Sequence, residues 1–147
     1  MSKIDHKNRP VYRYGFTVPD DVVDQNGHVN NVVYVQWMQD VALLHSDMVG
    51  GTRAMEAAGG TWVVRSHRVE YLRPAFAGDH VEAFTWVVNF RRVRSLRRYK
   101  FVRVTDNTVL AKGETEWVFV DGGTGRPRAI PGDVMRVFPV MSEDQDL

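Results

Sequence analysis

Apolar residues cover most of the circumference of one long segment, which the sequence predicts to be a helix beginning after Asn30 and ending near Val49. The clearest polar stripe on it, formed by Gln36, Asp40 and Asp47, spans only about 40° at 100° per residue. Asn30 is a typical N-cap, and Gly50-Gly51 ends the pattern. Because a surface helix carries a wide polar face, we expect this helix of about 30 Å to be mostly buried.

Five further segments have the alternation or the composition of β-strands: residues 11–18, 61–73, 81–91, 96–105 and 109–121. A short helical turn is expected at residues 52–58, and Asp106-Asn107 marks a tight turn. Short connections favour antiparallel pairing, since parallel neighbours need crossovers of a dozen residues or more. The pattern predicts an α+β fold in which a consecutive antiparallel meander of about five strands wraps a central helix.

Length and composition fit one folded domain over residues 1–147, with 44% apolar and 25% charged residues and no repeat or linker. The absence of cysteine excludes disulfides, thiolate metal sites and a cysteine nucleophile. The N-terminal residues have no apolar stretch typical of a signal peptide, and no apolar run approaches the roughly 18 residues of a membrane span. We therefore expect a cytoplasmic protein without a membrane partner.

The candidate chemistry lies just ahead of the long helix, where residues 24–28 bring together a carboxylate, a carboxamide and an imidazole from Asp24, Asn26 and His28. A carboxylate can act as a general base on water or as a nucleophile. The free N–H groups at a helix N-terminus can stabilise a developing oxyanion. The same residue types also form ordinary turns before helices, so spacing alone leaves both interpretations open.

The motif Asp-x-Asn-Gly-His-Val-Asn-Asn-x-x-Tyr-x-x-Trp, from Asp24 to Trp37, resembles the signature of hotdog-fold thioesterases. It is similar to both the 4-hydroxybenzoyl-CoA thioesterase family and the acyl-carrier-protein thioesterases. The resemblance continues through residues 69–79 and 117–121 and so covers nearly the whole chain. It implies a long helix wrapped by an antiparallel sheet, and hydrolysis of an acyl-CoA or acyl-carrier-protein thioester.

By this resemblance Asp24 takes the position of the catalytic carboxylate, and Asn26 and His28 match the amide and imidazole that accompany it. The backbone amide of Asn31 would polarise the thioester carbonyl. Many members carry a second Asp two residues before the catalytic one, and Val22 stands there in this chain. General-base action of Asp24 is the interpretation chosen here, with direct attack as the alternative.

A basic segment is the second feature, because residues 91–100 hold six of the nineteen lysines and arginines. One interpretation is a solvated hairpin, in which Tyr99 and Phe101 face inward and the charges face outward. The other is a site for the phosphates of coenzyme A, which suit arginine forks. The arginines proposed for that site are Arg91, Arg92, Arg94, Arg97 and Arg98. Nucleic acid is not the expected partner, because the net charge is only +1 and aromatic residues are few in this segment.

Other mechanisms find little support in the sequence. No two histidines lie within five residues of each other, so no local metal pair is expected, and no motif indicates a cofactor. A hotdog hydro-lyase acting on 3-hydroxyacyl thioesters is one alternative function. A non-catalytic acyl-CoA binding module is the other, and Asp24 argues against it.

Assembly is predicted from the expected sheet. A sheet that wraps one helix in a chain this short leaves an open edge, and strand edges are usually paired or covered. Hotdog proteins join two sheets edge to edge, and the resemblance carries that expectation here. We therefore predict at least a homodimer, or a dimer of dimers, with each active site built from two chains.

Overall fold

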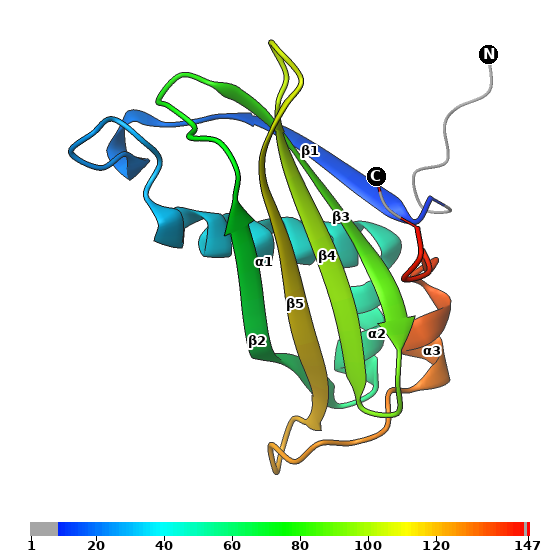
Figure 1. Ribbon diagram of the computed structural model, residues 1–147. Helices are drawn as coiled ribbons and strands as arrows, with labels where there is room; N and C mark the ends of the chain where they lie inside the picture. The colour runs from blue at the N-terminus through cyan, green and yellow to red at the C-terminus, as the bar shows by residue number, and fades with distance from the viewer. Residues whose placement is uncertain (1–8, 146) are drawn as a thin grey trace.

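A five-stranded antiparallel sheet curves around one long helix in the computed structural model, which describes residues 9–145 and 147 (Figure 1). The strands are β1 (Val11–Thr17), β2 (Gly60–Tyr71), β3 (His80–Phe90), β4 (Arg94–Arg103) and β5 (Thr108–Asp121). The helices are the 3₁₀ turn η2 (Asp20–Val22), α1 (Asn31–Val49), α2 (Gly51–Ala57) and α3 (Gly132–Arg136). The predicted fold class is confirmed, while α3 and η2 were not predicted.

The order of the strands is β1-β3-β4-β5-β2, so the predicted consecutive meander is wrong for β2. Only β3, β4 and β5 follow one another as hairpins. Residues 72–79 connect β2 to β3 and are too many for a hairpin turn, so they carry the chain across the end of the sheet. As a result β3 pairs with β1, β2 pairs with β5, and β1 and β2 form the two edges.

Both predicted ends of α1 are confirmed. The side chain of Asn30 accepts a hydrogen bond from the amide of Val32 at 3.3 Å, which satisfies one free N–H of the first turn. Gly50 ends the helix in the left-handed conformation with φ 88°, a conformation that glycine adopts without steric cost.

The main core lies between α1 and the concave face of the sheet. Tyr34 and Met38 of α1 pack in the same buried cluster as Tyr99 and Phe101 of β4 and Ala111 of β5. These positions follow the helical period on α1 and the two-residue period on the strands. One side of α1 is therefore anchored to the sheet.

The expectation that α1 is mostly buried is wrong for the single chain. Val32 is 70% exposed and Leu43 is 58% exposed, because one curved sheet covers only one side of a helix. Leu43 lies one turn from Gln39, whose side chain contacts His67 of β2 at 3.3 Å. Val32 and Leu43 are therefore exposed apolar residues beside the β2 edge of the sheet, on a helix face that also carries Gln36.

Candidate active site

The motif before α1 folds into a tight loop held by its own backbone. The amide of Asp24 donates to the carbonyl of His28 at 2.7 Å, and the amide of Gly27 donates to the carbonyl of Asp24 at 3.0 Å. Gly27 has φ 78°, which explains glycine at this turn. The amide of Asn30 donates to the carbonyl of Val22 at 2.9 Å, so the loop closes just where the helix starts.

The carboxylate of Asp24 is fixed by the loop yet open to solvent. Its Oδ1 accepts hydrogen bonds from the amides of Asn26, at 2.9 Å, and His28, at 3.1 Å. No side chain in the described part of the chain donates to its Oδ2. One carboxylate oxygen is therefore held in place while the other is available to bind a water molecule.

His28 contacts the segment that connects β2 to β3. Its backbone forms an isolated antiparallel bridge with Phe76, and the two rings meet edge to face with centroids 5.1 Å apart. The structure thus brings Asp24, Asn26 and His28 together through backbone hydrogen bonds. Within residues 9–145, the imidazole of His28 makes no side-chain hydrogen bond to Asp24.

Asn31 is the first residue of α1, and its amide belongs to the first turn, whose N–H groups have no acceptor within the helix. The hydroxyl of Tyr71, at the end of β2, donates to the carbonyl of Asn31 at 2.9 Å. This bond fixes the start of the helix against the sheet. The positioning contacts of Tyr71 and Phe76 were not predicted, although both residues lie in the stretch 69–79 that carried the family resemblance.

The five arginines of the basic segment do not lie on one face. Arg91 pairs with Glu143, Arg94 with Glu116 and Arg98 with Glu114, at 3.6, 3.0 and 3.6 Å respectively. Arg92 is exposed, and none of the described carboxylates forms an ion pair with it. Arg97 differs from the other four, because it is 5% exposed and faces inward.

The interpretation of this segment as a solvated hairpin with its charges outward is therefore wrong at Arg97. Arg97 has the same parity along β4 as Tyr99 and Phe101, which were predicted to face inward, and side chains two residues apart share a face. The structure separates Arg97 from the exposed arginines and places it beside a cavity.

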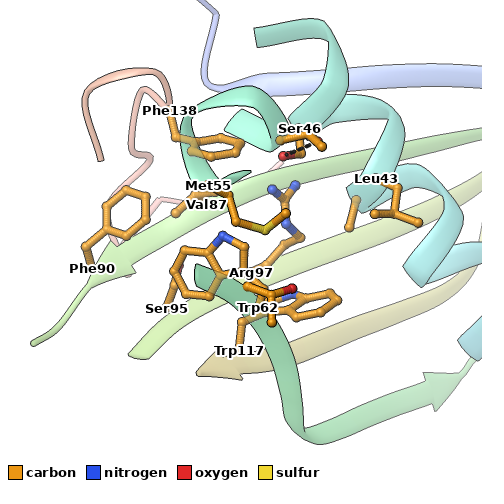
Figure 2. Close-up of a pocket in the computed structure, with 13 residues that line it drawn as sticks. Leu43, Ser46, Met55, Trp62, Val87, Phe90, Ser95, Arg97, Trp117 and Phe138 are labelled. Carbon is orange, nitrogen blue, oxygen red and sulfur yellow. Dashed lines mark hydrogen bonds between the residues drawn. The ribbon is translucent and has the colours of Figure 1, made fainter. Parts of the chain in front are cut away.

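That cavity, of about 130 Å³, lies between the second half of α1, α2 and the sheet (Figure 2). Its lining is mainly apolar and aromatic, including Leu43, Met55, Trp62, Phe90 and Phe138. Ala42 is the lining residue nearest the start of α1, about 16 Å along the axis from Asn31 at 1.5 Å per residue. Within one chain the cavity and the Asp24 loop are therefore apart.

Arg97 belongs to a buried polar group at this cavity. Its Nη1 donates to Nδ1 of His45 at 2.9 Å and to the hydroxyl of Thr85 at 3.0 Å, and the guanidinium lies over the ring of Phe138. Burial, helped by the nearby positive charge of Arg97, lowers the pKa of His45 to about 3, so this imidazole is neutral at ordinary pH. Burial also lowers the pKa of Arg97. Sequence reasoning missed His45 and Thr85, which lie 52 and 12 residues from Arg97 along the chain.

Among the described residues, no histidine, aspartate and glutamate side chains gather in a group of three or more that could hold a metal ion. None of the helices in this part of the chain has both the length and the apolar character needed to cross a membrane.

Comparison with known proteins gives consistent matches. The family model of the thioesterase-like superfamily matches residues 17–138. The acyl-CoA thioester hydrolase YbgC of Escherichia coli O157:H7 is 27% identical over 134 residues, which are 89% of this chain and 98% of that protein. The chloroplastic palmitoyl-acyl carrier protein thioesterase of Arabidopsis thaliana is also 27% identical, over 80% of this chain, but the match spans only 27% of the plant protein.

Solved structures match the fold at lower identity. The crystal structure of Slr0204, a 1,4-dihydroxy-2-naphthoyl-CoA thioesterase from Synechocystis, has a TM-score of 0.78 at 13% identity. The match covers 87% of this chain and 95% of that one. The sheet wrapped around α1 is therefore the hotdog fold, as the sequence motif predicted.

Proposed function

Because the chain belongs to the thioesterase-like superfamily, we propose that it hydrolyses an acyl thioester of coenzyme A with Asp24 as the general base. The proposal rests on how the two oxygens of the Asp24 carboxylate are hydrogen-bonded. Its Oδ1 is held by two backbone amides, and its Oδ2 is free to accept a proton from water. The likeness to YbgC, whose name states acyl-CoA thioester hydrolysis, supports this substrate class.

The proposed reaction needs one base and one oxyanion site. Asp24 takes a proton from water as the water oxygen attacks the carbonyl carbon of the thioester. The amide of Asn31 donates to the carbonyl oxygen, which becomes negatively charged in the tetrahedral intermediate. The intermediate collapses with loss of the thiolate of coenzyme A, which then takes up a proton. Asn26 and His28 orient the loop or contact the substrate.

The coenzyme A end is proposed to contact the exposed part of the basic segment. Arg92 is the best placed, because it is exposed and its guanidinium forms no ion pair among the described residues. Arg91, Arg94 and Arg98 would have to exchange a carboxylate partner for a phosphate. We do not assign this role to Arg97, whose side chain is buried.

The active unit is proposed to be a homodimer that joins two β2 edges. The open strand β2 and the exposed apolar residues Val32 and Leu43 beside it support this assembly. A two-fold arrangement could bring the Asp24 loop of one copy to the cavity of the other, which one chain alone keeps apart.

The test is release of free coenzyme A from a panel of acyl-CoA substrates, followed with a thiol reagent, for the wild type and Asp24→Asn. We expect the variant to lose at least about 100-fold in kcat, the scale for losing a positioned base, while its circular dichroism is unchanged. A variant that keeps more than about a tenth of the wild-type rate would contradict the role of Asp24. Hydration of an enoyl thioester without thiol release would favour a hydro-lyase, and tight binding without turnover a binding module.

A further inference from the structure

The cavity beside α1 contains a buried cation without a buried anion. Arg97 is 5% exposed, and no carboxylate of the described residues lies within ion-pair distance of it. Its hydrogen-bond acceptors are the neutral imidazole of His45 and the hydroxyl of Thr85. Burial of a charge is costly unless the charge is paired, so an anion bound next to this guanidinium would lower the free energy of the buried charge.

The unused donors of Arg97 are accessible from the cavity. Arg97 donates to described residues through Nη1 alone. Its Nε and Nη2 are not among the fully buried polar atoms without a partner, so both keep some exposed surface. Arg97 is one of the lining residues, and Figure 2 shows its guanidinium in the midst of the other side chains that surround the cavity. A guanidinium offers a planar fork of donors that matches the two oxygens of a carboxylate.

The rest of the cavity fits a short hydrocarbon segment. Trp62, Met55 and Phe90 line it with apolar surface. Its volume of about 130 Å³ is close to that of an apolar protein cavity of about 150 Å³ that accepts benzene, a six-carbon ligand. A chain of about six carbons that ends in an anion would therefore satisfy both the apolar walls and Arg97.

We propose that this cavity binds the distal end of the acyl group and that Arg97 pairs with a terminal carboxylate there, so that the substrate is a carboxyacyl thioester. This inference rests on the proposed thioesterase function and names its substrate class. The group that binds is the carboxylate at the end of the acyl chain remote from the thioester. Arg97 acts in specificity and takes no part in the chemical step.

The position of the mouth is compatible with this assignment. Leu43 lines the cavity and is 58% exposed, so we place the mouth of the cavity at Leu43, on the side of α1 next to β2 that the proposed dimer would cover. The thioester would then lie at the mouth, where the Asp24 loop of a second copy could reach it, and the terminal carboxylate would lie at Arg97.

The first experiment compares adipyl-CoA with hexanoyl-CoA, which differ only in a terminal carboxylate in place of a methyl group. For the wild type we expect kcat/KM to be at least about tenfold higher with adipyl-CoA, after subtraction of spontaneous hydrolysis. Arg97→Met should lower the adipyl-CoA value by about 10- to 100-fold, the scale of a lost charge-assisted hydrogen bond, and so abolish the preference for adipyl-CoA over hexanoyl-CoA. Lys100→Met, which removes a cation from the opposite face of β4, serves as the matched control and should keep the wild-type preference.

The second measurement needs no variant, so it remains informative if Arg97→Met fails to fold. Hexanoate should raise the melting temperature of the wild-type protein, and the neutral analogue 1-hexanol should raise it much less. Equal effects of the two compounds, or a wild-type preference for hexanoyl-CoA, would overturn the assignment of Arg97. Absence of turnover with every thioester would instead refute the proposed function, while the hexanoate measurement would still decide whether the cavity binds a carboxylate.

Discussion

At the scale of single residues, the side chains of Asp24 and His28 are held in place by different contacts. Asp24 accepts two backbone hydrogen bonds through one oxygen, whereas the His28 ring packs against Phe76 and its backbone amide donates to Asp24. The carboxylate is thus positioned by the chain itself. The imidazole is positioned by a neighbouring segment.

We therefore expect His28→Ala to reduce kcat less than Asp24→Asn does, because the backbone amide that holds Asp24 remains after truncation of the imidazole. Parallel steady-state kinetics of the two variants on the same acyl-CoA measure the difference. Losses of equal size would show that the two side chains act as one acid–base pair.

His45 gives a prediction for stability against pH. Its pKa is about 3 in the folded chain against an ordinary 6.5, mainly because of burial, so the imidazole is neutral when folded and takes up a proton on unfolding below about pH 6.5. Since the unfolded state then binds more protons, stability falls as the pH falls from about 6.5 toward 3. The slope attributable to His45 approaches about 1.4 kcal/mol per pH unit.

His45→Gln should flatten this slope, because glutamine can still accept from Arg97 but does not titrate. Urea unfolding at pH 7.5, 6.0 and 5.0 measures it for both proteins. Burial also lowers the pKa of His67, so a smaller slope of the same sign should persist in the variant. An unchanged slope would mean that the imidazole of His45 is already protonated, or is in contact with water, in the folded protein.

At the scale of elements, the start of β2 packs directly on β5. Gly60 is buried, and a Cβ there would lie 2.4 Å from the ring of Phe119 and 3.0 Å from the carbonyl oxygen of Val120. Phe119 is fully buried in a cluster with Ile130 and Val134, so its ring has little room to move.

Gly60→Ala should therefore destabilise the protein by about 1–3 kcal/mol, as overpacking of a filled core does. The free energy of unfolding in urea measures the change. Gly15→Ala in β1 is the matched control, since its Cβ would meet only one carbonyl oxygen at 4.0 Å, and we expect a change within about 0.5 kcal/mol. Equal effects at both sites would contradict the close packing at Gly60.

At the scale of the whole molecule, the described residues leave two neighbouring surfaces open. The edge strand β2 has no partner strand on its outer side, and the exposed apolar residues Val32 and Leu43 lie next to it on α1. Both surfaces would be covered by a second copy related by a two-fold axis, the commonest symmetry of soluble assemblies.

Val32→Glu should shift the proposed dimer toward monomers and abolish most of the activity. Val32 is 70% exposed in the single chain, and a negative charge in the first turn of a helix is compatible with its dipole, so the chain itself should still fold. Sedimentation equilibrium at micromolar concentration measures the assembly. Val104→Glu, at an exposed valine beyond the end of β4, is the control and should stay dimeric. A wild-type monomer with full thioesterase activity would refute the shared site.

Features that depend on neighbours along the chain could be predicted before the fold was known. Asn30 and Gly50 set the ends of α1, because caps act within one helical turn. Asp24 and Gly27 shape the loop that holds the candidate carboxylate, because the hydrogen bonds that these two residues form within it span four residues or fewer. The inward position of Arg97 was also readable from its parity with Tyr99, although the run of positive charges suggested a solvated surface.

The order of the strands, the exposure of Val32 and Leu43 on α1 and the composition of the cavity depend on long-range packing and could not be predicted. The meander was wrong for β2 because pairing at an edge depends on which strand reaches it, and residues 72–79 are long enough to reach either side. His45 and Arg97 meet although 52 residues separate them, since a helix and a strand each carry one of them to the same point of the core. The burial of α1 depends on how much of its surface one sheet can cover. Periodicity along the chain shows which face is apolar but not how much surface is covered.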